Sequence, residues 1–421
     1  MADVQPLRAL HYDLAMVGSA ADVTAPPYDV IDARQREELL GRSPFNVVAI
    51  DLPRAEPGER DAYAVAGDLF ESWQLQGAIV RDPQPALWAH TQTYSGPDGQ
   101  RQTRRGFFCR VRIEGYGPGK VRPHERTHPC PKEDRLRLMR ATRANLSPIF
   151  SLYSDPSGAA WAALEPATAQ APWGEVTDAD GTVHRVWRVA DPRAIAAVQA
   201  ATRDAELLIA DGHHRYETAG TYADEIGGEG EHRYVLMCLV ALEDPGLTVF
   251  PTHRLLSGLD EQRRTALREA LQRDFEMSEV PIERIAPEQG TGPLQLGYID
   301  SHHGSAYRLT LRDQAIADAA LEGFSQAYRT LDTGVLEALL LKGALGMTDE
   351  DIAHFNGLFY ARSTDEAVSL VRSGEYDAAL LMRPTPVSQV RDVAAAGENM
   401  PPKSTFFYPK LLTGLLFNPL S

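Results

Sequence analysis

Residues 206–217 of the chain read Glu-Leu-Leu-Ile-Ala-Asp-Gly-His-His-Arg-Tyr-Glu. The run from Glu206 to Ala210, apolar after its first residue, has the length and composition of a short buried strand, and it leads directly into an Asp-Gly turn. The pattern from His214 to Ile226 predicts a helix. A helix that begins directly after such a strand presents backbone N–H groups and the positive end of its dipole at the turn. The stretch therefore predicts an anion site, with phosphate as the natural ligand.

Each residue type at this turn suits a phosphate site. Asp211 can cap the helix or hold a divalent cation, and Gly212 lets the backbone approach a ligand closely. Arg215 supplies a planar fork for phosphate oxygens, beside His213 and His214. The alternative interpretation is a plain Asp-Gly turn whose histidines cap the helix or pack against it. The residues alone leave both interpretations open.

A second candidate site is the run His-Glu-Arg-Thr-His at residues 124–128. It matches HExxH, in which two histidines on one helical face bind zinc and the glutamate activates water. Prolines directly before and after the run leave no room for a long helix, so the sequence predicts that this is not a zinc site. A zinc hydrolase built on His124, Glu125 and His128 stays as an alternative. In an extended loop, Glu125 would offer a general base and Arg126 a phosphate partner, although a solvated polar loop would also explain both.

A third candidate lies near the C-terminus, where Lys403, Ser404 and Thr405 resemble the lysine and hydroxyl pair of a P-loop. Prolines stand in place of the glycine-rich run that cradles phosphates, so this is not a Walker motif. The three side chains could still line a phosphate pocket. Packing of the aromatic residues at 406–408 explains the segment equally well.

Alternating strand and helix patterns predict a mixed α/β (α+β) fold. With 421 residues, the length favours two domains, which we place at residues 1–256 and 257–421. The N-terminal α/β domain carries both histidine motifs, and the C-terminal part is a second α/β domain. Predicted strands include Phe45–Leu52, Ala86–Tyr94, Arg105–Ile113, Thr182–Val189 and Tyr234–Leu242, and predicted helices include Lys132–Leu146, Pro192–Arg203, Leu331–Gly346 and Val387–Ala396.

Composition narrows the classes of function. The formal net charge of −16 repels nucleic-acid phosphates and anionic membrane surfaces, so the sequence predicts no nucleic-acid partner. Three cysteines at irregular spacing suit a reducing compartment. With no signal-peptide pattern at the start and no apolar run of membrane-spanning length, we expect a cytoplasmic protein without a membrane partner. The sequence sets no oligomeric state.

Five ordered motifs carry a family resemblance. They are Ala-Pro-Pro-Tyr-Asp-Val-Ile at 25–31, His-Glu-Arg-Thr at 124–127, Ala-Asn-Leu-Ser-Pro-Ile-Phe at 144–150, Ala-Asp-Gly-His-His-Arg-Tyr-Glu-Thr-Ala at 210–219, and Met-Pro-Pro-Lys-Ser-Thr at 400–405. Together they resemble the prokaryotic family known as domain of unknown function ten-fifteen, over nearly the whole chain. Tyr28, in the first motif, joins the predicted substrate- and phosphate-binding residues.

The Asp-Gly-His-His-Arg core is also similar to the phosphate-binding motif of the ParB and sulfiredoxin-like superfamily, which includes free serine kinases. This resemblance implies a ParB/sulfiredoxin-like core and a kinase-like phosphotransferase of serine metabolism. The small-molecule substrate would be serine, phosphoserine or a similar hydroxy acid, with ADP, ATP or pyrophosphate as phosphate donor and Mg²⁺ as cofactor. Glu125 matches the upstream glutamate that acts as base, Asp211 would hold the metal, and His213, His214 and Arg215 would stabilise the transferred group. A nucleotide- or metabolite-sensing module without turnover is the other alternative, while His128 departs from the family pattern and leaves the metal question open.

Overall fold

The structure is a computed structural model that describes residues 2–55, 60–96, 99–118, 120–125, 129–288, 290 and 292–421. The chain forms two compact units. The first takes in residues 1–123, 127–248 and 409–421, and the second takes in residues 124–126 and 249–408. The main passage from one unit to the other lies between residues 248 and 249. The return of the last residues to the first unit was not anticipated by the sequence.

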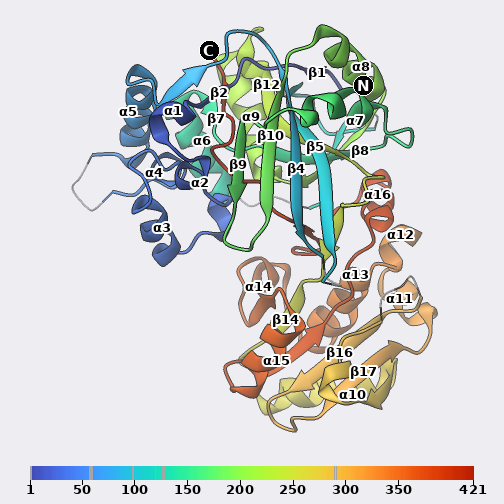
Figure 1. The fold of residues 1–421 in the computed structure, drawn as a ribbon. Helices are drawn as coiled ribbons and strands as arrows, with labels where there is room; N and C mark the ends of the chain where they lie inside the picture. Colours follow the sequence, from blue (N-terminus) through green and yellow to red (C-terminus); the bar gives the residue numbers. More distant parts are fainter. Residues whose placement is uncertain are drawn as a thin grey trace. The chain divides into compact units, whose positions relative to one another are not determined.

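The first unit is built on a nine-stranded mixed sheet (Figure 1). Its strands run in the order β6-β11-β8-β12-β5-β4-β10-β9, and β1 also pairs with β5. The β12/β8 and β11/β6 pairs are parallel and the other pairs are antiparallel. The bounds are β1 Val4–Gln5, β4 Leu87–Ser95, β5 Arg101–Arg112, β6 Val121–Arg122, β8 Ile149–Tyr153, β9 Gly174–Thr177, β10 Val183–Val189, β11 Leu207–Asp211 and β12 Tyr234–Ala241.

Alternation along the strands gives this sheet two different faces. On one face Phe107, Cys109 and Val111 of β5 join a large apolar core with side chains of four helices. These helices are α6 Pro129–Thr142, α7 Ala159–Leu164, α8 Pro192–Thr202 and α9 His213–Ile226. On the other face β4 and β5 carry the buried polar residues Gln92 and Arg104. The sheet therefore has one apolar face and one face with buried polar groups.

A second apolar cluster of the first unit joins short N-terminal helices to the end of the chain. It contains Trp73, Phe70 and Val48 together with Phe417, which is fully buried. The helices are α1 Leu14–Val17, α2 Ala20–Val23, α3 Ala33–Leu40, α4 Val48–Asp51 and α5 Ala62–Leu75. Strands β2 (Leu10–Tyr12) and β3 (Ile79–Arg81) pair nearby, and β21 (Asn418–Pro419) pairs with β7 (Ala144–Asn145). The last residues of the chain are thus part of this core.

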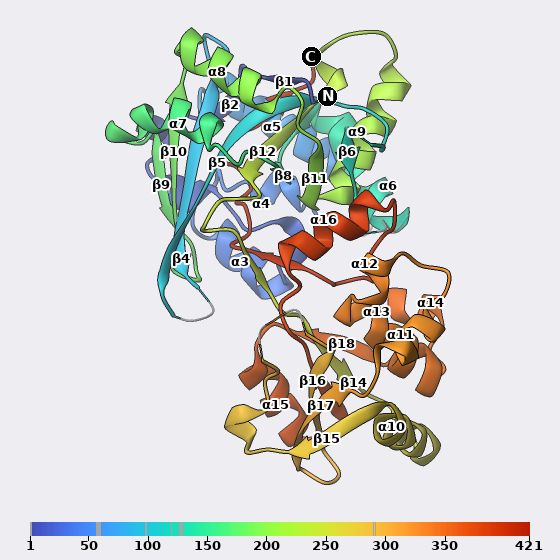
Figure 2. The same ribbon diagram turned by 90° about the vertical axis from the view of Figure 1, so that its right-hand side faces the viewer.

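The second unit holds a six-stranded antiparallel sheet in the order β15-β17-β16-β19-β14-β18 (Figure 2). Its strands are β14 His253–Leu256, β15 Phe275–Glu279, β16 Gln295–Asp300, β17 Ala306–Leu311, β18 Leu358–Ala361 and β19 Ala378–Leu381. The short strands β13 (Thr248–Phe250) and β20 (Phe406–Tyr408) pair with each other. Its helices are α10 Glu261–Asp274, α11 Gln314–Ala320, α12 Gln326–Arg329, α13 Asp332–Leu336, α14 Asp349–Ala353, α15 Thr364–Arg372 and α16 Val387–Ala395, with a π-helix at Glu337–Ala344.

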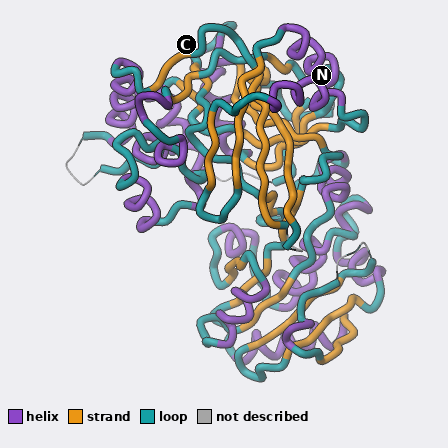
Figure 3. Tube along the Cα trace, viewed as in Figure 1, coloured by secondary structure: helices purple, strands orange, loops and turns teal. Residues whose placement is uncertain are grey.

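The predicted mixed α/β class is confirmed, and Figure 3 shows how strands and helices alternate along the trace. The predicted strand Phe45–Leu52 is wrong, because this run contains the short helix α4. Asn46 is buried, and its side chain accepts the Val48 N–H at 3.0 Å and donates to the Asp22 carbonyl at 2.7 Å. These bonds stabilise a buried helical turn in this apolar run. Within the described ranges, every helix is too short or too polar to cross a bilayer.

The buried His253 predicts a loss of stability in mild acid. Burial, reinforced by Arg254, lowers the pKa of His253 to about 4, and its Nδ1 accepts the Met382 N–H at 3.0 Å. In the unfolded chain the pKa is about 6.5, so between these values only the unfolded state binds the proton. The free energy of unfolding should fall by about 1.4 kcal/mol per pH unit across this window as the pH decreases.

Urea unfolding at pH 7.5 and pH 5.5 checks this expectation with His253→Asn, whose amide oxygen can accept the same N–H. The variant should lose less stability than the wild type between the two pH values, whereas His302→Asn, in an exposed turn, should not differ from the wild type. Equal losses in all three proteins would contradict the assignment to His253.

Candidate active site

The turn between β11 and α9 is shaped by a bulge and a glycine. The pairing of β11 with β8 shifts register between Ile209 and Asp211, which redirects the end of the strand. Gly212 follows with φ of 100°, a conformation that favours glycine, and α9 begins at His213. Arg215 packs so closely over Gly212 that a Cβ there would lie 3.1 Å from its Nε. The predicted strand, turn and helix are all present.

Asp211 lies between two cations. Its Oδ1 pairs with Nζ of Lys410, and its Oδ2 pairs with Nη2 of Arg215. Burial alone would raise the pKa of the Asp211 carboxyl, but Lys410 and Arg215 outweigh it and hold that pKa well below its usual range. The two cations therefore favour the ionised form of this carboxylate.

The motif at residues 144–150 fixes the position of Arg215. Nη1 of Arg215 donates to the Pro148 carbonyl, while its Nη2 holds Asp211. The Arg215 side chain is only 13% exposed, so its direction is set by the surrounding chain. Two of the five motifs thus meet through this one side chain.

Tyr28, from the first motif, lies in the same neighbourhood. Arg135 of α6 stacks on the Tyr28 ring at 4.1 Å from its centre and pairs with Asp51 at 3.1 Å. Burial raises the pKa of Tyr28 to about 12, although Arg215 and Arg135 both act to lower it. A small cavity of about 30 Å³ is lined by Asp51, Arg135 and Arg215 among others, which is room for about one water molecule. The structure thus brings Tyr28 and Arg215 together.

The two histidines of the motif begin α9. His213 is buried, with 7% of its surface exposed, and its charge would favour the ionised Asp211. His214 is partly exposed. Both lie in the first turn, where the N–H groups of an α-helix have no partner within the helix. The start of α9 therefore brings together Asp211, Gly212, His213, His214 and Arg215, and Lys410 adds a second cation.

Lys410 is a site residue that sequence reasoning missed. It stands 199 residues after Asp211 in the chain. Its own carbonyl accepts Nε2 of Gln92 at 2.9 Å, and the preceding carbonyl of Pro409 accepts Nη2 of Arg104. The available signals were weak. Arg104 is one of five arginines in β5 and the one that is buried, and Lys410 follows closely on the motif at 400–405.

The other two motifs meet in the second unit. Glu125 forms a β-bridge with Met400, and the Met400 N–H donates to the His124 carbonyl at 2.8 Å. Nε2 of His124 lies 2.8 Å from Oγ1 of Thr405. The segment is extended at Glu125 rather than helical, as the prolines predicted. Arg126 and His128 lie outside the described residues, so the zinc alternative stays untested.

Lys403 and Ser404 have different surroundings. The Ser404 hydroxyl is buried, donating to the Pro401 carbonyl at 2.7 Å and lying 2.8 Å from Oγ1 of Thr333. These bonds shape the loop. Lys403 is exposed and has a positive φ of 57°. Glu125 is partly exposed, and its charge acts on Arg254 and Tyr360 of the same unit.

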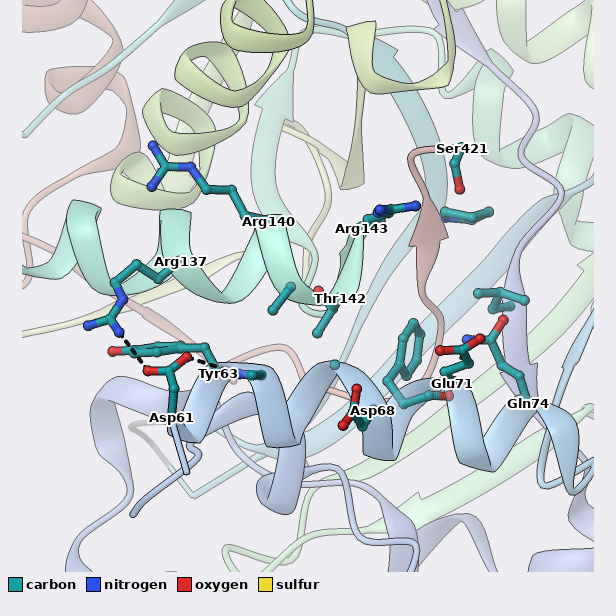
Figure 4. A pocket seen from close by; sticks show the side chains of 16 residues that line it. Asp61, Tyr63, Asp68, Glu71, Gln74, Arg137, Arg140, Thr142, Arg143 and Ser421 are labelled. Carbon is teal, nitrogen blue, oxygen red and sulfur yellow. Dashed lines mark hydrogen bonds and ion pairs between the residues drawn. The ribbon is translucent and has the colours of Figure 1, made fainter. Parts of the chain in front are cut away.

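A wide cavity elsewhere in the first unit is unrelated to these motifs. Figure 4 shows this cavity of about 740 Å³ between α5 and α6, lined by charged side chains. Arg137 pairs with Asp61 there at 2.6 Å, and Arg140 pairs with Glu225 at 2.6 Å. Because these pairs are about half exposed and none of the five motifs lines the cavity, it has the character of a solvated groove.

Comparison with known proteins gives one family match and several distant structural likenesses. Residues 4–334 match the family model described as "Protein of unknown function (DUF1015)". Among curated proteins, no match is found. A conserved hypothetical protein from Pyrococcus furiosus is similar at 15% identity, with 68% of this chain and 87% of that chain covered and a TM-score of 0.35.

Two further solved structures resemble the chain with similarly low sequence identity and TM-score. A free serine kinase in complex with AMP shows 14% identity over 68% of this chain and 83% of that chain, with a TM-score of 0.34. SbnI with a C-terminal truncation, from Staphylococcus aureus, shows 12% identity over 70% of this chain and 82% of that chain, with a TM-score of 0.36.

Proposed function

This chain belongs to the family described as "Protein of unknown function (DUF1015)", as its five motifs predicted, and we propose that it is a phosphotransferase acting on free serine or a similar small hydroxy acid. The observation that carries the proposal is the cationic start of α9, where Lys410 and Arg215 flank Asp211. Phosphoryl transfer is catalysed mainly by positioning and by countering the charge of the transferred group, which is the chemistry such a cluster can supply. The choice of serine rests on the resemblance of the Asp-Gly-His-His-Arg motif.

The proposed step moves one phosphoryl group. Glu125 accepts the proton of the serine hydroxyl as the hydroxyl oxygen bonds to phosphorus, and the donor's bridging P–O bond breaks with its electrons on the leaving group. ADP would leave as AMP, ATP as ADP, and pyrophosphate as phosphate. Gly212 and the first N–H groups of α9 would bind phosphoryl oxygens with His213, His214 and Arg215.

The remaining predicted residues take secondary places in this proposal. Tyr28 would border the pocket through its contact with Arg135, and Lys403 would offer an exposed cation to the donor. Ser404 and Thr405 are assigned to support of the loop, since their hydroxyls bond within the second unit. Arg126 keeps its proposed phosphate contact, and a ParB/sulfiredoxin-like core remains the proposed fold type.

The Mg²⁺ that the resemblance implies does not fit Asp211 as its ligand. Both carboxylate oxygens are taken up by Lys410 and Arg215, and a dication placed there would be repelled by these two charges. Among the described residues, no group of three or more His, Cys, Asp or Glu side chains is arranged to hold a metal ion. Any Mg²⁺ in the reaction is therefore proposed to be bound by the donor's phosphates.

Incubation of the purified protein with serine, Mg²⁺ and each donor tests the proposal. Phosphoserine, followed by mass spectrometry, should form with at least one of ADP, ATP and pyrophosphate, or should be consumed in the reverse direction. Failure of serine, phosphoserine and close analogues with all three donors would overturn the kinase proposal. Tight donor binding without product would then favour the sensing module.

The variant Arg215→Ala is expected to weaken binding of the donor. The guanidinium of Arg215 would donate charge-assisted hydrogen bonds to the donor's phosphate in the ground state as well as in the transition state. Without them, KM for the donor should rise roughly 10-fold or more. Initial rates measured over a range of donor concentrations will show the defect mainly at low concentration. An unchanged donor KM would remove Arg215 from the proposed phosphate site.

A further inference from the structure

Lys410 is held in place by its backbone as well as by its side chain. Gln92 of β4 donates to the Lys410 carbonyl at 2.9 Å, and Arg104 of β5 donates to the carbonyl just before it. Arg104 and Gln92 are themselves joined, with Nε of Arg104 3.0 Å from Oε1 of Gln92. Side chains of β4 and β5 therefore fix the backbone at Pro409 and Lys410, and the lysine side chain extends from there to Asp211.

Arg104 is an unusual residue to bury. Only 1% of its surface is exposed, and its guanidinium lies 4.4 Å from the centre of the Phe150 ring. Burial lowers the pKa of Arg104 to about 10, although Asp244 and Asp211 are among the groups that oppose this shift. Burying a cation in this way costs free energy. We therefore expect the buried position of Arg104 to have a role in the fold or in the site.

Asp211 shares its one carboxylate between two cations. Lys410 and Arg215 both pair with it, and its charge also acts on the buried Arg104. Nearby Arg135 is matched by Asp51, and Asp244 is paired with Arg105 at 2.9 Å. Two cations held side by side on one carboxylate can also bind the oxygens of another anion, and an anion with two charged oxygens suits them best.

We infer that Lys410 binds the phosphoryl group of the donor directly, and that Asp211, Gln92 and Arg104 are positioning residues for it. This inference rests on the proposed function and deepens it. Asp211 holds Lys410 and Arg215 side by side, and phosphoryl oxygens then replace its carboxylate oxygens as their partners. Lys410 and Arg215 thereby supply the charge that a metal at Asp211 would otherwise supply.

A purely structural ion pair is the competing explanation. The segment is already anchored without the lysine side chain, by the Thr413 bridge to Ala25 and by the Phe417 backbone bonds to Leu10. Phe417 is also fully buried in the core. Removing Nζ of Lys410 should therefore leave the fold intact while it changes anion binding.

Calorimetric titration with inorganic pyrophosphate in the presence of EDTA tests the inference on the full chain. Lys410→Met should weaken pyrophosphate binding roughly 10- to 100-fold, as expected for one charge-assisted contact, and Lys410→Arg should restore part of the loss. Lys120→Met is the matched control, because Lys120 lies in the same unit and is half exposed. Equal affinity of Lys410→Met and the wild type would overturn the inference.

Asp211→Asn separates positioning from metal binding. Removing the competing carboxylate should leave metal-free pyrophosphate binding as tight as in the wild type or tighter, while the maximal rate of phosphoserine formation falls. A metal-holding Asp211 predicts instead that pyrophosphate binding is unchanged in EDTA and is weakened only when Mg²⁺ is present. That result would contradict the role given to Asp211.

Chemical labelling of the wild type keeps the test decisive if a variant fails to fold. Pyrophosphate should reduce acetylation of Lys410 by acetic anhydride and leave Lys120 unaffected, as measured by mass spectrometry of peptides. Unchanged labelling of Lys410 would overturn the inference. Because pyrophosphate binding needs no serine, a protein that binds it through Lys410 but forms no phosphoserine would refute only the proposed function.

Discussion

Glu125→Gln is expected to lower the rate of phosphoserine formation by about 10²–10⁴-fold, the usual cost of losing a general base. Glutamine keeps the shape of the side chain but cannot accept the proton of the serine hydroxyl. The backbone at Glu125 is fixed by its bridge to Met400, so the substitution should not disturb the loop. Initial rates at saturating serine and donor will measure the effect.

Donor binding should survive this change, because the predicted phosphate contacts belong to other residues. Glu337→Gln is a suitable control, since Glu337 also acts electrostatically on Arg254 but pairs with Lys342 at 2.8 Å. The control should retain most of the rate. A comparable loss in both variants would point to a general electrostatic effect around Arg254 and would remove Glu125 as the base.

Gly246→Ala should be strongly destabilising. A Cβ at this position would lie 2.2 Å from the carbonyl oxygen of Thr103 and 2.4 Å from its carbonyl carbon, so the backbone of β5 would have to move. Gly246 also accepts the Tyr94 hydroxyl at 2.9 Å. Overpacking of this kind costs about 1–3 kcal/mol and occasionally more, and it should lower Tm by several degrees.

Gly220→Ala provides the matched control. Gly220 lies within α9, and the nearest atom to an added Cβ is Cγ2 of Ile113 at 3.8 Å, an ordinary contact. This variant should be stabilised by roughly 0.5–1 kcal/mol, because alanine loses less conformational freedom in a helix. Thermal unfolding of both variants will show whether their changes have opposite signs. A Gly246→Ala protein as stable as the wild type would contradict the close approach to Thr103.

The centre of the candidate site could be predicted because its geometry is local. A buried strand, an Asp-Gly pair and a helix pattern follow one another from 206 to 226, and the structure places them as β11, a left-handed Gly212 and α9. The strands predicted at Ala86–Tyr94 and Arg105–Ile113 are also local patterns, and the structure has them as the paired strands β4 and β5.

Residues that reach the site from distant parts of the chain could not be found in this way. Lys410 meets Asp211 from a segment whose backbone Gln92 and Arg104 hold, and no local pattern encodes that contact. The predicted strand at Phe45–Leu52 was wrong for a related reason. A short apolar run is compatible with a strand or with a buried helical turn. Here Asn46 bonds to residues more than twenty positions away, and these bonds stabilise the turn.

The return of residues 409–421 to the first unit has a consequence for biosynthesis. A ribosome makes the strands that carry Asp211 and Arg104 long before it makes Lys410, and residues 249–408 of the second unit emerge in between. A nascent chain that has folded these strands still lacks one cation of the cluster and the apolar anchor Phe417. Translation that stops early would therefore leave an incomplete and exposed sheet face that is open to proteolysis.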